Sequence, residues 1–124
     1  MSDAIELIQR FCDEWGKAGN VDAIVEYFTD DAVYHNIPVA PVTGKDAIRA
    51  TIEMFTTGVD RMEFRVLNIA ANGDIVLTER VDAFFLPDKT IELPVMGTFE
   101  VRGGKIAAWR DYFDLNQYMS QLQG

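Results

Sequence analysis

The hydrophobic positions of this chain follow two different periods. Over most of residues 3–57 they recur every three to four residues, as on the buried face of an amphipathic helix. From residue 62 onward they alternate with polar positions, as on a half-buried strand. Helices followed by a run of strands predict an α+β protein whose strands form an antiparallel meander.

The first half of the sequence predicts three helices and one strand. The helices are expected at residues 3–18, 21–28 and 45–57, with the strand at 32–38. Thr43 and Asp46 form a capping-box pattern before the third helix, and Gly58 is suited to end it. The second half predicts four strands and a short C-terminal helix. The strands are expected at residues 62–71, 74–86, 90–102 and 105–114, with the helix at 115–123.

Sequence motifs typical of hairpins separate these strands, among them NGD at 72–74 and GG at 103–104. A long, mostly antiparallel sheet that curves over the N-terminal helices would form a cone with a deep pocket. Residues from several strands that point inward would line this pocket.

Composition narrows the class of protein. The 124 residues are 48% hydrophobic, which favours a single folded domain over residues 1–124. The net charge of −9 argues against nucleic acid and anionic membranes as partners. A single cysteine, Cys12, excludes an internal disulfide, and its helical spacing indicates a buried core thiol. The N-terminus lacks a signal-peptide pattern and no apolar run is long enough to span a membrane, so we expect a cytoplasmic protein.

Polar side chains are expected on the inward face of three strands. Alternation within TERVDAFF at 78–85 puts Arg80 and Asp82 on one face among apolar neighbours. Tyr34 and Asn36 share a face of the strand at 32–38, and Asp111 shares a face with two aromatic residues of the last strand. An arginine can offset one buried carboxylate or bridge two. The same pattern is also typical of a solvated face or of an ordinary cross-strand ion pair.

Several chemistries lack the residues they need. The sequence has two serines, both near the ends, one histidine and no G-x-S-x-G motif, so a Ser-His-Asp triad is poorly provided for. No His/Cys cluster has metal-ligand spacing, and neither G-x-G-x-x-G nor a P-loop occurs. Acid–base chemistry by carboxylates remains, with a tyrosine and an asparagine to orient a small molecule.

Three segments together resemble the limonene-1,2-epoxide hydrolases. YHNIPVAPVTGKDAI resembles the Tyr-x-Asn-x-Pro segment of that family, ERVDAF its Arg-x-Asp strand, and WRDYFDL the strand with its second aspartate. The resemblance implies the cone-shaped fold shared with ketosteroid isomerases. It also implies that Asp111 is the general base, Asp82 the general acid and Arg80 the arginine between them, while Tyr34 and Asn36 hold the attacking water.

The activity implied by this resemblance is hydrolysis of a small apolar epoxide, cyclic or terpene-like, to a vicinal diol, with no cofactor or metal. Candidate apolar residues of the pocket are Leu67, Leu86, Met96 and Phe113. A homodimer is also expected, because an open sheet leaves one face exposed. Alternating apolar residues such as Leu93, Val95, Phe99 and Val101 are expected to cover this face by pairing with a second copy of the chain.

Two other functions stay open. One is a ketosteroid-isomerase-like or polyketide-cyclase-like enzyme, in which one aspartate moves a proton on carbon. This alternative uses Tyr34 and one aspartate but gives Asn36 and the set of Arg80, Asp82 and Asp111 no clear role. The other is a ligand-binding module of the same fold without catalysis, since a fold does not determine a function.

Overall fold

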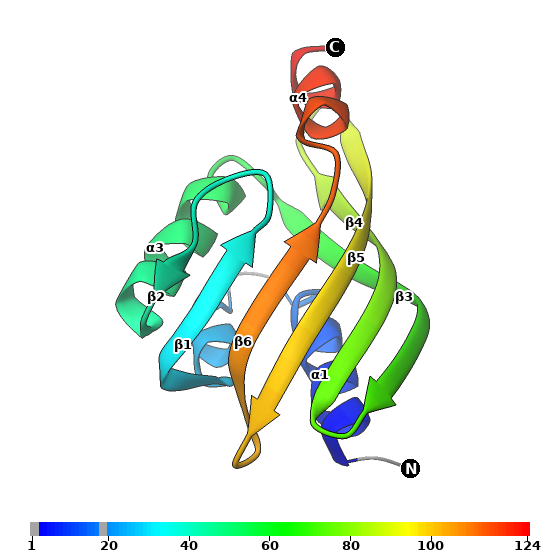
Figure 1. The fold of residues 1–124 in the computed structure, drawn as a ribbon. Coiled ribbons are helices and arrows are strands. Elements are labelled where there is room, and N and C mark those ends of the chain that lie inside the picture. Colours follow the sequence, from blue (N-terminus) through cyan, green and yellow to red (C-terminus); the bar gives the residue numbers. More distant parts are fainter. Residues whose placement is uncertain (1–2, 18–19) are drawn as a thin grey trace.

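The computed structural model describes residues 3–17 and 20–124. Within these residues it contains four helices and one six-stranded sheet, which confirms the α+β class (Figure 1). In chain order the elements are α1 (Asp3–Glu14), α2 (Val21–Val25), β1 (Phe28–Asn36), β2 (Val42–Thr43), α3 (Lys45–Thr56), β3 (Arg61–Asn72), β4 (Ile75–Phe85), β5 (Thr90–Arg102), β6 (Lys105–Tyr112) and α4 (Leu115–Gln123).

The sheet has the strand order β2-β1-β6-β5-β4-β3. Its hairpins are antiparallel, as the alternating second half of the sequence predicts, but β1 and β6 run parallel. The chain leaves β1, forms β2, α3 and the three-strand meander, and returns as β6 beside β1. This return of the chain places the end of β1 next to the end of β6 within the sheet (Figure 1).

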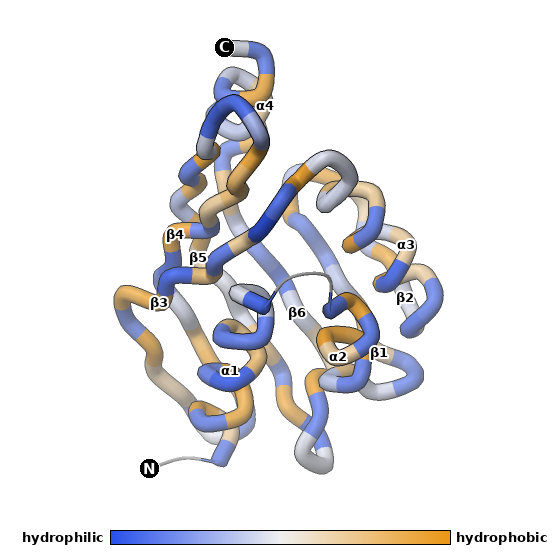
Figure 2. The backbone as a smooth tube through the Cα atoms, turned by 180° about the vertical axis from the view of Figure 1, so that it is seen from behind, coloured by the Kyte–Doolittle hydropathy of each residue, from blue (hydrophilic) through white to orange (hydrophobic). Residues whose placement is uncertain are grey.

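Helices cover one face of the sheet, and α1 and α2 lie across it in the view from behind (Figure 2). The core between helices and sheet is largely aromatic. Phe11 of α1 makes an edge-to-face contact with Trp109 of β6 at 5.1 Å between ring centroids, and both side chains are fully buried. Edge-to-face pairs of this kind stabilise a core beyond the area they bury. This packing fixes the inward face of β6, which carries the predicted Asp111.

Helix boundaries differ from the predictions in three places. Helix α1 ends at Glu14, although the sequence predicts an end near residue 18, which lies outside the described residues together with the break expected at Gly19. Helix α2 is shorter than predicted because β1 already begins at Phe28. The capping box predicted for α3 is wrong: Thr43 pairs with Val33 in the sheet, so the N-cap position falls to Gly44, which makes no side-chain cap.

The prediction of which face of β5 is exposed is also wrong. Leu93, Val95 and Phe99 are buried, and Val101 packs against the core. Leu93 pairs with Asp82 and Val95 with Arg80 across the β4–β5 ladder, and directly paired residues of an antiparallel ladder share a face. The outer face instead carries exposed Leu77, Met96 and Tyr112.

Helix α4 follows β6 at the open end of the sheet (Figure 1). Its N-terminus is capped by the Asp114 side chain, which accepts hydrogen bonds from the backbone amides of Asn116 and Gln117. Lys89 Nζ donates to the carbonyls of Gln121 and Leu122 at 3.1 and 3.0 Å. None of the helices in the described part of the chain combines the length and apolar character needed to cross a bilayer.

Candidate active site

Arg80 is the centre of the buried polar residues. It lies on the inward face of β4, and 1% of its surface is exposed. A guanidinium has five N–H donors in a fixed plane, and burying it without partners would be very unfavourable. Its neighbours therefore have to supply both opposite charge and hydrogen-bond acceptors.

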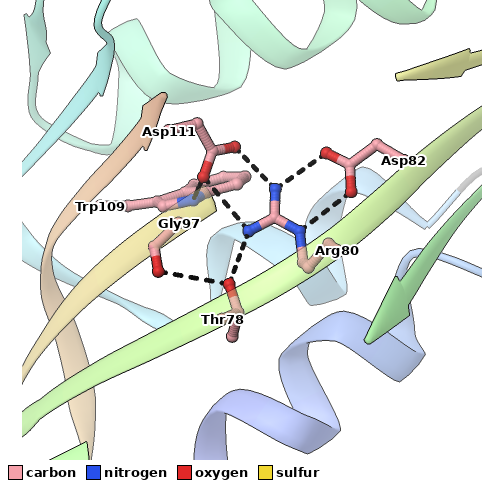
Figure 3. A network of polar contacts seen from close by, with 6 residues as sticks. All are labelled: Thr78, Arg80, Asp82, Gly97, Trp109 and Asp111. Carbon is pink, nitrogen blue, oxygen red and sulfur yellow. Dashed lines mark hydrogen bonds and ion pairs between the residues drawn. The ribbon is translucent and has the colours of Figure 1, made fainter. Parts of the chain in front are cut away.

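Asp82, two residues further along β4, occupies one edge of the guanidinium. Arg80 Nε donates to Asp82 Oδ1 at 2.9 Å, and Nη2 donates to Oδ2 at 2.8 Å (Figure 3). The pair is bidentate, which is the strongest geometry for an arginine and a carboxylate. Alternation along the strand is the direct cause, because residues two apart share a face.

Asp111 occupies the second edge of the same guanidinium. Arg80 Nη2 donates to Asp111 Oδ2 at 2.8 Å and Nη1 to Oδ1 at 3.2 Å. Nη1 also donates to the hydroxyl of Thr78 at 3.1 Å. Trp109 Nε1 donates to Asp111 Oδ1 at 2.7 Å, which fixes that carboxylate from β6 (Figure 3). The predicted convergence of Arg80, Asp82 and Asp111 is thus confirmed, and all five guanidinium donors are used.

One cation between two carboxylates leaves the group with one negative charge in excess if both aspartates ionise. Burial, partly offset by Arg80, raises the pKa of Asp82 to about 6, and the charge of Asp111 acts in the same direction as burial. Burial opposes the charge of Arg80, yet the two carboxylates hold its pKa well above the usual value. Asp82 is therefore suited to carry a proton near neutral pH.

Tyr34 and Asn36 come from β1, which is the parallel neighbour of β6. The register places Tyr34 beside Trp109 and Asn36 beside Asp111. The Tyr34 ring stacks on the Trp109 ring with centroids 4.2 Å apart. Burial, and then the charge of Asp111, raise the pKa of Tyr34 well above its usual value, so its hydroxyl keeps its proton. A hydrogen bond from Asn36 acts against this rise.

A cavity of about 160 Å³ opens onto this group. Tyr34, Asn36, Asp82 and Asp111 all contribute to its wall. The other lining residues are mainly apolar: Val39, Thr51, Met54, Phe55, Met62, Phe64, Phe84, Leu93, Val95, Phe113, Leu115 and Tyr118. A larger cavity of about 220 Å³, near Trp15 and Arg61, contains neither carboxylate, so the smaller cavity is the candidate site.

Only one of the four apolar residues predicted for the pocket lines the cavity. Phe113 lines the cavity, as predicted. Leu67 and Met96 are 58% and 52% exposed, so their assignment to the pocket is wrong. Met96 alternates with the inward Val95 of β5 and therefore points outward. Leu86 is half-buried against the core and does not line the cavity.

Several residues of the site are absent from the predictions made from the sequence. Leu93 and Val95 line the cavity and were assigned to the opposite face. Thr78 and Gly97 touch the polar cluster and were not singled out. Thr78 had a signal, since it shares the alternating face of Arg80 and Asp82, whereas a glycine that leaves space open has none in a single sequence.

Among residues 3–17 and 20–124, no three side chains of His, Cys, Asp or Glu gather closely enough to hold an ion. Cys12 is buried, and burial raises the pKa of its thiol to about 12, so it remains a neutral core residue, as its spacing predicts.

The fold and site define a small α+β protein that presents two carboxylates, one tyrosine and one asparagine to an apolar cavity. The model of the limonene-1,2-epoxide hydrolase catalytic domain matches residues 2–123, and the chain therefore belongs to this epoxide hydrolase family. It is 35% identical over 104 residues to the epoxide hydrolase EphG of Mycobacterium tuberculosis, covering 83% of this chain and 69% of the relative.

Solved structures agree with the family. The structure of an LEH-like epoxide hydrolase from Mycobacterium tuberculosis matches with a TM-score of 0.83 and 30% identity, covering 98% of this chain and 90% of the other. A protein from Shewanella putrefaciens described as a SnoaL-like polyketide cyclase matches with a TM-score of 0.87, covering 99% of this chain and 98% of the other. At 15% identity the second match shows the fold alone.

Proposed function

We propose that the protein opens a small apolar epoxide to a vicinal diol by a single attack of water, with Asp111 as general base and Asp82 as general acid. The observation that supports this most directly is the pair of carboxylates on the two edges of one buried guanidinium, at the wall of an apolar cavity. Two carboxylates that share one cation favour different protonation states, which is what an acid and a base require.

Asp111 takes a proton from the attacking water. Its Oδ1 accepts hydrogen bonds from Trp109 and Arg80 and its Oδ2 accepts from Arg80, and these donors fix its position at the cavity wall. Tyr34 and Asn36, from the neighbouring strand, hold the water and set its direction of attack. Such positioning lowers the entropic part of the barrier.

Asp82 donates a proton to the epoxide oxygen as the ring opens. Its pKa of about 6 leaves a minority of the carboxyl protonated at neutral pH. An apolar substrate that fills the cavity removes water from Asp82 and pushes the pKa further in the same direction. Binding of the substrate therefore favours the protonated form of Asp82.

Arg80 does not line the cavity and acts from behind the two aspartates. Its guanidinium fixes both carboxylates in one plane and balances the charge that moves from Asp111 to Asp82 during the reaction. No step needs a covalent intermediate or a cofactor.

The cavity favours a small substrate. Its volume of about 160 Å³ is below the roughly 300–1,000 Å³ of pockets for drug-sized ligands. Apart from the carboxylates and their neighbours, its wall is mainly apolar, which suits a cyclic or terpene-like hydrocarbon with one epoxide group.

The test is turnover of a panel of cyclic and linear epoxides, scored by diol formation, together with a steroid enone as substrate for isomerisation. Diol formation from a small cyclic epoxide supports the proposal. Isomerisation of the enone without diol formation would favour a ketosteroid-isomerase-like activity. Binding of panel members without turnover would favour a module that only binds ligands.

The homodimer is part of the proposal, with a changed interface. The outer face of the sheet carries exposed Leu77, Met96 and Tyr112, which a second copy of the chain could cover. Light scattering at micromolar concentration tests this, and a monomer mass would exclude the dimer. The cytoplasmic location stays a prediction that fractionation of cells can test.

A further inference from the structure

Gly97 lies at the one place on β5 where both neighbouring strands bring a polar side chain to the cluster. It pairs with Thr78 of β4 on one side and with Asp111 of β6 on the other. Gly97 is buried, and the guanidinium of Arg80 passes in front of it to reach Asp111 (Figure 3). Its carbonyl also accepts a hydrogen bond from the Thr78 hydroxyl at 3.3 Å.

The space in front of Gly97 is filled by the polar groups themselves. A Cβ on this residue would lie less than 3.0 Å from Arg80 Nη1. It would also lie 2.6 Å from Asp111 Oδ1 and 3.0 Å from Thr78 Oγ1. Gly97 is not among the glycines with positive φ, so its backbone suits any residue. The need for glycine here therefore comes from side-chain space and not from the turn of the chain.

We infer that Gly97 is a positioning residue, whose missing side chain holds open the space in which Arg80 reaches Asp111. The inference rests on the proposed function, because it assigns Gly97 to the acid–base pair of that mechanism. Gly97 does not line the cavity and does not touch the substrate. It acts through the groups for which it leaves room, and the nearest of these is the guanidinium that serves both carboxylates.

A methyl group at position 97 would change how Arg80 is shared. The guanidinium is confined by the Phe64 ring, 4.6 Å from its central carbon, and by the bidentate contact with Asp82. Pushed from the Asp111 side, it moves toward Asp82. Closer pairing with a cation favours the ionised form, so the pKa of Asp82 falls below about 6. Less of the acid then carries the proton that it has to donate.

The first experiment compares the wild type with Gly97→Ala and with Val76→Ile. Val76 is a fully buried residue on the same face of β4, so Val76→Ile adds volume to the core without touching the cluster. We expect Gly97→Ala to lower kcat by about 10²-fold with KM unchanged, as for a small misplacement of catalytic groups. The basic limb of the pH–rate profile should also move to lower pH, and Val76→Ile should leave the profile in place.

Unchanged kcat and pH profile in Gly97→Ala would overturn the inference. So would a lower kcat with an unmoved profile, because that result describes ordinary loss of packing. A double-mutant cycle covers the case in which Gly97→Ala does not fold. Arg80→Met removes the guanidinium, which is the group nearest to residue 97. Gly97→Ala should therefore lower the urea midpoint less in the Arg80→Met background than in the wild type. An equal or larger drop in that background, or failure of the double variant to fold, would contradict the inference.

One readout separates this inference from the proposed function. Carboxyl carbon-13 NMR follows the titration of Asp82 without any substrate. If the wild type hydrolyses no epoxide, the proposed function fails. A lower Asp82 midpoint in Gly97→Ala would still support the positioning role, and an unchanged midpoint would overturn it.

Discussion

Asn36 lies directly beside Asp111, because β1 and β6 are parallel neighbours whose register pairs these two residues. Both side chains line the cavity, so a water molecule between them would meet an amide and a carboxylate at once. The same pairing puts Tyr34 over the Trp109 ring, and the Trp109 indole in turn donates to Asp111. A single parallel contact in the sheet thus brings together the residues to which the proposed mechanism assigns the attacking water.

Asp111→Asn should abolish epoxide hydrolysis and leave the fold intact. The amide cannot take a proton from water, and a general base contributes about 10²–10⁴ to a rate. Its oxygen can still accept the hydrogen bond from Trp109, so the core is preserved. Diol formation and melting temperature should be measured on the same sample. Asp88→Asn, an equal change of charge in the exposed turn between β4 and β5, should have full activity. If Asp111→Asn kept wild-type turnover, Asp111 would not be the base.

Asp82→Asn should also abolish hydrolysis, but its effect on stability depends on pH. The pKa of Asp82 is raised from 3.8 to about 6, so the folded protein holds a proton that the unfolded chain has already released between these values. The ionised carboxylate therefore opposes folding above pH 6 by about 3 kcal/mol, and this penalty is absent below about pH 4.

Asn resembles the protonated acid at every pH. Asp82→Asn should therefore melt at or above the wild-type temperature at pH 8, and the difference should shrink as the pH falls toward 4. Thermal melts of both proteins from pH 4 to 8 test this. A variant that is less stable than the wild type at pH 8 and equally so at pH 4 would show that Asp82 is not protonated on folding.

Tyr34→Phe should lower kcat/KM by about tenfold, which is less than either aspartate substitution. One hydrogen bond contributes about 0.5–1.5 kcal/mol, and 1.4 kcal/mol corresponds to a factor of ten. Phe keeps the stack on Trp109, so the melting temperature should change little. Tyr112→Phe removes a phenol oxygen from the outer face of β6 and serves as the control. Equal activities of the two variants would remove Tyr34 from the water site.

Much of the fold follows from the period of the sequence. The alternation in residues 62–114 predicts the four meander strands to within about two residues, because a half-buried strand has to alternate. The parallel pairing of β1 with β6 does not follow, since parallel and antiparallel strands share that period. This pairing depends on packing across the whole sheet, and it positions Tyr34 and Asn36.

The charged part of the site follows from the sequence, whereas of the four apolar residues predicted for the pocket only Phe113 lines it. Arg80, Asp82 and Asp111 break the apolar pattern of faces that otherwise read as buried, so their shared parity is informative. Strand β5 has apolar residues on both faces, for example Val95 inward and Met96 outward, so alternation alone cannot tell which face lines the cavity. The ladder with β4 decides it, by pairing Val95 with Arg80.

Oxygen from solvent water should enter the diol in the first turnover. The reaction is run with enzyme in excess over epoxide in oxygen-18 water, and the diol is analysed by mass spectrometry. Direct attack puts the label in the diol at once. A covalent route would give a first diol whose added oxygen comes from an aspartate. The labelled oxygen of water would then enter the carboxylate of that aspartate.

The geometry favours direct attack. Both oxygens of Asp82 accept hydrogen bonds from Arg80, and both oxygens of Asp111 do so as well, so neither carboxylate has an oxygen free of the guanidinium. Carboxylate oxygens bound in this way are poor nucleophiles, but Asp111 can still accept a proton from a water held by Tyr34 and Asn36. Peptides from the same reaction should therefore carry no label on Asp82 or Asp111. Label on either aspartate would indicate a covalent route and would overturn the roles proposed for both aspartates.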